Sequence, residues 1–294
     1  MLTLPRIIAP VDLSERSELG ARYAGRLACH FRSQLTLLHV LDLSGYELTA
    51  SEFNQFSQGW HRQAEASLER FLPEEFRNMD VRRVMLSGDA AGEIVNFAHS
   101  RHSSLIVIPT HGYGPLRQCL LGSVAAKVLH NADCPILSGV LMPDAFPDEV
   151  HTFRKILCAV DFCPQSAKAL EWASQFADEF HAELTIAHIT PSTEGRAGEY
   201  FNPEVHGRWA METRQGEFVM RAREKLETLR KNAGANATVF INSSNDIPQA
   251  VCSAASELEA DLVVVGRGSS EGIERLRTKV YSIVRQSPCP VVSV

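Results

Sequence analysis

The chain of 294 residues is long enough for two domains of about 100–150 residues each, and its 45% apolar and 22% charged residues are typical of a globular protein. A formal net charge of −6 argues against a nucleic-acid-binding face, and no apolar run reaches the ~18 residues that a membrane span needs. The N-terminus lacks the features of a secretion signal, so we expect a cytoplasmic protein without a membrane partner. The odd number of seven cysteines predicts free thiols rather than a disulfide framework.

Short apolar segments alternate with helical segments along the first half, which predicts a parallel sheet covered by helices on both faces. Ser14 is placed to cap the first helix, whose Leu19, Tyr23 and Leu27 recur every four positions and form its core face. The expected strands are 5–12, 34–40, 81–86, 105–108 and 135–140. The later helices are expected at 49–71, 90–99 and 123–131.

The second half repeats this order, so we expect two domains, residues 1–141 and 153–294, joined by an acidic, proline-containing linker. The offset between the copies is 149 residues at Asp12 and Asp161 and 155 at Cys134 and Cys289. A repeat of this length fixes the domain count. In the second copy, 191–209 is expected to be an exposed loop, followed by a long charged helix at 212–231.

The segment 105–135 carries the strongest functional signal. Its strand is followed by a loop with Gly112 and Gly114 and then by a helix start at Gly122 and Ser123. Glycines let backbone N–H groups approach an anion, and a helix start presents unpaired N–H groups, so this layout predicts a phosphate site. In doubly wound sheets, ligands bind at the carboxyl ends of the strands, so we expect one cleft in each domain.

The spacing of Gly112, nine residues, and Gly122-Ser123 resembles the nucleotide-binding loop of the universal stress protein family, although Pro109 stands in place of that family's first glycine. Together with Pro10-Val11-Asp12 and the two Cys-Pro strand openings, the resemblance covers both copies. The chain therefore looks like a tandem universal stress protein. The resemblance implies two doubly wound, five-stranded parallel α/β domains of the nucleotide-binding, adenine nucleotide α-hydrolase-like kind. It also implies a pseudo-twofold pair in which the closing strands of the two domains meet, and it leaves a homodimer open.

The resemblance also implies site residues. Asp12 corresponds to an acid that accepts hydrogen bonds from adenine or ribose, and Val40 to a residue whose backbone reads the adenine edge. The helix start would hold the phosphates. The nucleotide-binding residues carried over to the first copy are Pro10, Val11, Asp12, Val40, Ile108, Pro109, His111, Gly112, Gly122, Ser123 and Val124. A degenerate second site, without nucleotide, is expected at Asp161, Ile189, Gly266, Gly268, Arg277 and Thr278.

Three functions stay open. The first is a stress-response protein that binds ATP or another adenine nucleotide, with Mg²⁺ accompanying the nucleotide as the sole metal considered. The second is a stress-associated interaction protein that binds no nucleotide or another small ligand; Pro109 favours it, because proline lacks the N–H group that a phosphate loop uses. The third, an enzyme acting on a small phosphorylated compound, has the least support. No catalytic residue is identified, and at most slow ATP hydrolysis is conceivable.

Structural roles compete with the functional ones. Asp12 and Asp161 are also placed to cap the helices that follow them, and for Asp161 we favour that role. His39 and His188 lie on buried strands and are expected to be packed, hydrogen-bonded histidines rather than metal ligands. His99 and His102 are expected to be solvated.

Overall fold

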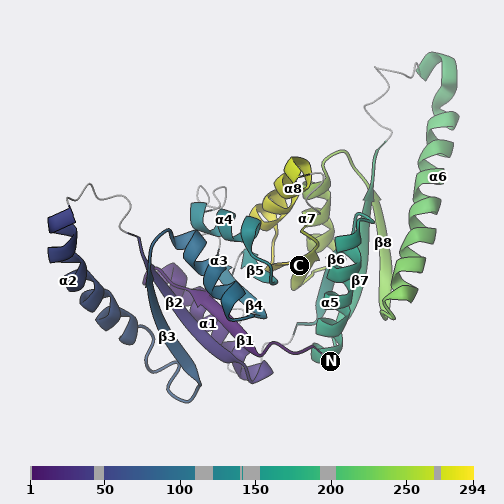
Figure 1. Cartoon of the computed structure of the whole chain (residues 1–294). Helices are drawn as coiled ribbons and strands as arrows, with labels where there is room; N and C mark the ends of the chain where they lie inside the picture. Colours follow the sequence, from purple (N-terminus) through teal and green to yellow (C-terminus); the bar gives the residue numbers. More distant parts are fainter. Residues whose placement is uncertain are drawn as a thin grey trace. The chain divides into compact units, whose positions relative to one another are not determined.

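The computed structural model describes residues 2–42, 50–109, 122–139, 141, 153–192, 203–267 and 273–294, and at 50–58, 203–214 and 273–278 it describes the backbone alone. The chain divides into two compact units, Thr3–His151 and Thr152–Val294. In each unit strands and helices alternate along the chain (Figure 1). The predicted fold class, two doubly wound α/β domains with five-stranded parallel sheets, is confirmed.

The strand order of the first unit is β3-β2-β1-β4-β5, and its strand pairs are parallel. Right-handed crossovers place α1 and α2 on one face of this sheet and α3 and α4 on the other. The elements in chain order are β1 (Arg6–Pro10), α1 (Glu15–Phe31), β2 (Gln34–Leu41), α2 (Ala50–Glu69), β3 (Val81–Ser87), α3 (Ala90–Ser100), β4 (Leu105–Pro109), α4 (Ser123–Asn131) and β5 (Ile136–Gly139).

The second unit has the matching order β8-β7-β6-β9-β10, again with parallel pairs. Its elements are β6 (Lys155–Ala159), α5 (Pro164–Phe180), β7 (Glu183–Thr190), α6 (Pro203–Asn232), β8 (Ala237–Ser243), α7 (Ile247–Glu257), β9 (Leu262–Val265), α8 (Ile273–Gln286) and β10 (Val291–Ser293). None of the described helices has the length and apolar character that a membrane crossing requires.

The central strands form the core of each sheet. Ile7 on β1 and Ile106 and Val107 on β4 have no exposed surface, because helices cover both faces of these strands. Burying each such side chain stabilises the fold by about 1.5–3 kcal/mol. This rigid centre fixes the strand ends at which a ligand site can form.

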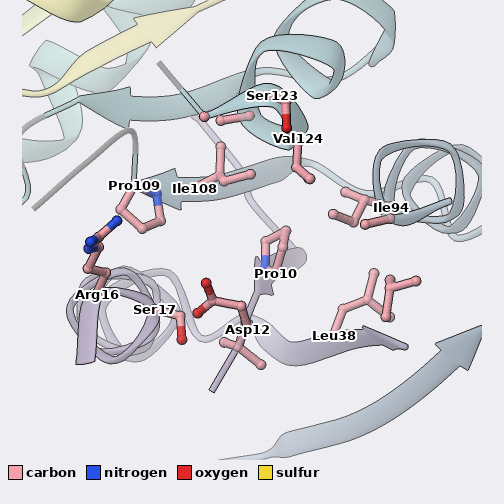
Figure 2. Close-up of a pocket in the computed structure, with 15 residues that line it drawn as sticks. Pro10, Asp12, Arg16, Ser17, Leu38, Ile94, Ile108, Pro109, Ser123 and Val124 are labelled. Atoms are coloured by element: carbon pink, nitrogen blue, oxygen red, sulfur yellow. The ribbon is translucent and has the colours of Figure 1, made fainter. Parts of the chain in front are cut away.

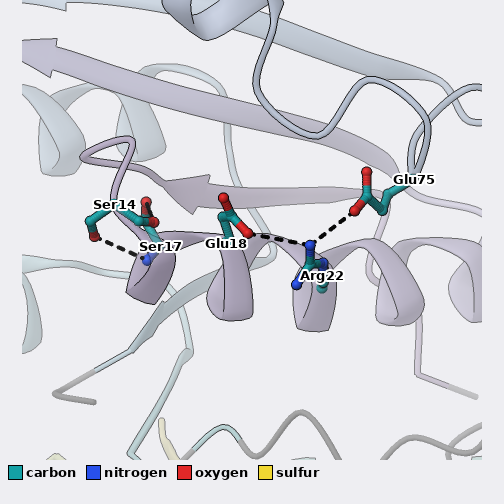
Figure 3. Close-up of polar contacts among 5 residues, drawn as sticks. All are labelled: Ser14, Ser17, Glu18, Arg22 and Glu75. Carbon is teal, nitrogen blue, oxygen red and sulfur yellow. Dashed lines mark hydrogen bonds and ion pairs between the residues drawn. The ribbon is translucent and has the colours of Figure 1, made fainter. Parts of the chain in front are cut away.

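Local signals set the ends of α1. The Ser14 side chain accepts a hydrogen bond from the backbone N–H of Ser17, as predicted, and Arg32 ends the helix with a left-handed φ of 53°. One Arg22 nitrogen, Nη2, lies 3.3 Å from Glu18 and 2.9 Å from Glu75 (Figure 3). All three side chains are more than 30% exposed, so each pair contributes at most about 1 kcal/mol.

The prediction of a loop at 191–209 is wrong in its last part, because α6 begins at Pro203 and runs for 30 residues. Proline is favoured in the first turn of a helix, where its missing N–H group costs nothing. The predicted charged helix at 212–231 is therefore confirmed, but it begins earlier than its charge pattern indicates.

Candidate functional site

A cavity of about 290 Å³ opens at the carboxyl end of the first unit's sheet (Figure 2). It lies where the strand order reverses, because β1 pairs with β2 on one side and with β4 on the other. Its volume is near the lower limit of about 300–1,000 Å³ for small-molecule sites. The lining residues are Pro10, Val11, Asp12, Arg16, Ser17, Leu38, Val40, Ala90, Ile94, Ile108, Pro109, Gly122, Ser123, Val124 and Ala125.

Asp12 follows β1, and the start of α1 holds its carboxylate. Oδ1 of Asp12 accepts hydrogen bonds from the backbone N–H (3.0 Å) and from the hydroxyl of Ser14, across a turn in which Leu13 has a left-handed φ of 63°. Burial opposes ionisation, but hydrogen bonds from Ser14 and Ser17 outweigh it and lower the pKa of Asp12 from its ordinary value. Asp12 is therefore ionised at neutral pH. Both bonds from Ser14 end on Oδ1.

The start of α4 brings unpaired N–H groups to the same cavity. The N-cap residue is Gly122, no side chain among the described residues caps this helix, and its first turn contains no acid. By contrast, Asp89 caps α3 by accepting a 2.8 Å hydrogen bond from Gly92. Since Gly122, Ser123 and Val124 line the cavity, the first-turn N–H groups of α4, which have no partner within the helix, and its partial positive charge lie where an anion could use them.

Pro109 ends β4 and depends on a glycine in α1. A Cβ atom at Gly20 would lie 2.7 Å from Cδ of Pro109, closer than such atoms approach in real structures. In the second unit the larger residue lies on the helix instead, because Ala169 matches Gly20 and Gly266 matches Pro109. The proline is thus accommodated by a compensating change in the neighbouring helix.

The corresponding cavity of the second unit measures about 80 Å³. Larger side chains enter it from two helices, because Ile247 stands where the first unit has Ala90 and Lys279 where it has Val124. Ala187, which stands in place of Leu38, is smaller and would enlarge the cavity. We therefore attribute the smaller volume to the side chains from α7 and α8. The lining residues are Ala159, Val160, Asp161, Ser166, Ala187, His188, Ile189, Ile247, Val251, Val265, Gly266, Lys279, Val280 and Ile283.

The helix start has also moved in the second unit. Aligned on the Cys-Pro pairs, Gly122 and Ser123 correspond to Arg277 and Thr278, yet α8 already begins at Ile273. The matching positions lie one turn inside α8, where N–H groups bond to carbonyls of the preceding turn. The second unit therefore offers no free helix N–H groups at this place.

Comparison with known proteins gives the family. A model described as the universal stress protein family matches residues 3–138 and 152–294. The chain belongs to the universal stress protein family. Two matched segments of these lengths make it a tandem universal stress protein.

Relatives of this tandem universal stress protein match about half of its length. It is 32% identical over 136 residues to a universal stress protein of Methanocaldococcus jannaschii, a match that covers 45% of this chain and 79% of the relative. It is 31% identical over 135 residues to one of Mycobacterium tuberculosis, covering 45% and 44% respectively. A solved universal stress protein from Archaeoglobus fulgidus covers 98% of this chain and 95% of its own, with a TM-score of 0.64 and 21% identity, which supports the fold.

The structure brings together most of the predicted site residues of this universal stress protein. Of the eleven in the first unit, nine line the cavity, and His111 and Gly112 lie outside the described residues. In the second unit, Asp161, Ile189 and Gly266 line the smaller cavity. Gly268 and the side chains of Arg277 and Thr278 are outside the described part.

Six lining residues were missed from sequence. Their signals were weak but physical: Leu38 shares a strand face with Val40, and Ala90 and Ile94 lie one helical turn apart. Arg16 and Ser17 stand in the first turn after the Asp12 loop. The residues missed are Arg16, Ser17, Leu38, Ala90, Ile94 and Ala125.

The capping role favoured for Asp161 is wrong, because Cys163 is the N-cap residue of α5. Oδ1 of Asp161 instead accepts hydrogen bonds from the Cys163 N–H (3.1 Å) and the Ser166 hydroxyl (2.7 Å). Phe162, with a φ of 64°, separates the acid from the helix. Burial opposes ionisation here too, but these bonds lower the pKa of Asp161. Both units therefore keep an acid that accepts from the N–H two residues on, while the hydroxyl donor is Ser14 in the first unit and Ser166 in the second.

The two strand histidines are packed and hydrogen-bonded, as predicted. Nδ1 of His39 lies 2.8 Å from the carbonyl of Val11, and Nδ1 of His188 lies 2.7 Å from that of Val160. Because a carbonyl can only accept, Nδ1 carries the proton in both rings. Within the residues that the structure describes, no group of three or more His, Cys, Asp or Glu side chains gathers at metal-binding distance.

Proposed function

We propose that the first unit binds ATP or another adenine nucleotide in its cavity, and that the protein acts in the stress response through this binding. One observation carries the proposal: an ionised carboxylate and an uncapped helix start line the same apolar slot. A base would pack against Leu38, Val40 and Ile94, and the Asp12 carboxylate would accept hydrogen bonds from ribose or adenine. The N–H groups of α4 would bind phosphate, accompanied by Mg²⁺ if the nucleotide carries it.

An alternative function is protein interaction without nucleotide. Pro109 favours it, because the end of β4 lacks an N–H group that could reach a phosphate. The compensation by Gly20 shows that this proline is built into the packing of α1 on β4. Under the alternative, neither cavity binds a nucleotide.

The two acid turns provide a matched test. Asp12→Asn and Asp161→Asn remove the same charge from the same local structure, so a change common to both reports on the fold. We expect calorimetry with ATP and Mg²⁺ to show that Asp12→Asn lowers ATP affinity by about 10- to 100-fold, which is the contribution of a hydrogen bond to a charged group. Asp161→Asn should bind like the wild type.

Two results would count against this proposal. Equal losses in both variants would contradict the assignment to the first cavity. No binding by the wild type would favour the interaction protein.

A further inference from the structure

Arg16 is a cation at the cavity that has no partner among the described residues. It lies in the first turn of α1, and Figure 2 shows its guanidinium beside Pro109 at the end of β4. Among the described residues, the Arg16 side chain forms no ion pair or hydrogen bond, and Asp12, which lines the same cavity, does not pair with it. Arg22, two turns further along the helix, is bound by Glu18 and Glu75.

The local structure gives no reason for this arginine. The first turn of a helix has a partial positive charge, so a cation there is unfavourable unless an anion lies nearby. Glu15 and Glu18 in the same turn follow the expected pattern, and Arg16 departs from it. Residues that break a local rule are concentrated at functional sites.

The second unit supplies an internal comparison. Gln165 occupies the position of Arg16, and Gly266 occupies that of Pro109. The first unit thus combines the cation Arg16 with a proline that has no N–H group, and the second combines a neutral glutamine with a glycine. The two positions are neighbours, since a Cβ atom at Gly266 would lie 3.1 Å from the backbone of Gln165.

We propose that Arg16 is a specificity-determining residue that binds the nucleotide's phosphates from the β4 side of the cavity, where Pro109 cannot donate. This inference rests on the nucleotide binding proposed for the first unit. A guanidinium donates two parallel hydrogen bonds to a phosphate and keeps its charge at all physiological pH values. The cavity therefore prefers phosphorylated adenine nucleotides over adenosine, and the preference grows with phosphate charge.

The test compares ATP with adenosine in the full-length protein. Arg16→Gln introduces the residue of the second unit. Arg16→Lys keeps the positive charge but cannot donate two parallel hydrogen bonds. Arg22→Gln, on the same helix, is the control for the change in net charge. We expect Arg16→Gln to lose about ten-fold in ATP affinity, typical of one charge-assisted contact, and to leave adenosine affinity within about two-fold. The ATP affinity of Arg16→Lys should lie between those of the wild type and Arg16→Gln. Arg22→Gln should bind ATP and adenosine as the wild type does.

The outcomes separate the two proposals. If the wild type binds ATP and Arg16→Gln binds it equally well, the Arg16 assignment is wrong and the proposed function stands. Equal losses for ATP and adenosine would also refute it, because they indicate a change in cavity shape. If the wild type binds neither compound, both proposals fail. Binding of ATP should weaken more steeply with salt in the wild type than in Arg16→Gln.

Discussion

The two halves of the chain share one fold and differ at one end of their sheets. Both keep the acid turn after the first strand, with Asp12 or Asp161 bonded to the helix start, and both keep a histidine bonded to the neighbouring strand-end carbonyl. The cavities differ in volume, about 290 against 80 Å³. The shared features are therefore part of the fold, and the differences change the size of ligand that each cleft can accommodate.

Three differences act together in the second unit. The helix start has moved to Ile273, Lys279 replaces an apolar wall residue, and Gln165 replaces the cation Arg16. The moved helix start and the loss of the arginine would each weaken phosphate binding, whereas Lys279 brings a cation to the cavity but takes up part of its space. None of the three residues lies on a buried strand. The residues that differ lie in helix starts and loops at the strand ends, where substitutions are tolerated more readily than in the buried strands.

The largest expected effect comes from giving the first unit the second unit's residue at the helix start. A side chain at Gly122 occupies the space where phosphates approach, so Gly122→Arg should lower ATP affinity by at least about 100-fold, or ~2.7 kcal/mol. Gly59→Arg is the control, since nothing lies within 4 Å of a Cβ atom there. Thermal unfolding of Gly122→Arg should be close to that of the wild type, and Gly59→Arg should be at least as stable as the wild type because arginine favours a helix more than glycine does. Wild-type ATP affinity in Gly122→Arg would show that phosphates do not bind at α4.

A smaller effect, on stability, tests whether Pro109 requires a glycine at position 20. Gly20→Ala gains up to about 1 kcal/mol of helix propensity but forces Cβ against the rigid ring, and overpacking costs about 1–3 kcal/mol. We expect net destabilisation in denaturant unfolding. The double variant Gly20→Ala/Pro109→Gly reproduces the pair of the second unit and should recover most of the loss.

The control for this exchange is Gly59→Ala, which lies in open space and should stabilise α2 by up to about 1 kcal/mol. If Gly20→Ala were equally stabilising, the contact with Pro109 would not limit this position.

The parts of the fold that follow from buried strands and capped helices could be predicted from sequence. The apolar run at β4, the cap Ser14 and the repeated acid turn each have a local cause, and the cavity residues nearest to them followed from their place at the strand ends. The start of α8 could not be predicted, because Ile273 and the charged residues after it have no cap signal. Arg16 was missed for a related reason: its role depends on the approach of β4, which no spacing within α1 records.

The stoichiometry of ATP binding to the intact chain tests the difference between the two clefts most directly. Equilibrium dialysis at saturating ATP and Mg²⁺ should give one nucleotide per chain, because the second unit lacks the helix start, the arginine of α1 and the volume of the first. At an ATP concentration about ten times the wild-type Kd, Gly122→Arg should bind at most about 0.1 nucleotide per chain, as a 100-fold loss of affinity requires. Two nucleotides per chain, or one that persists in Gly122→Arg, would contradict the account.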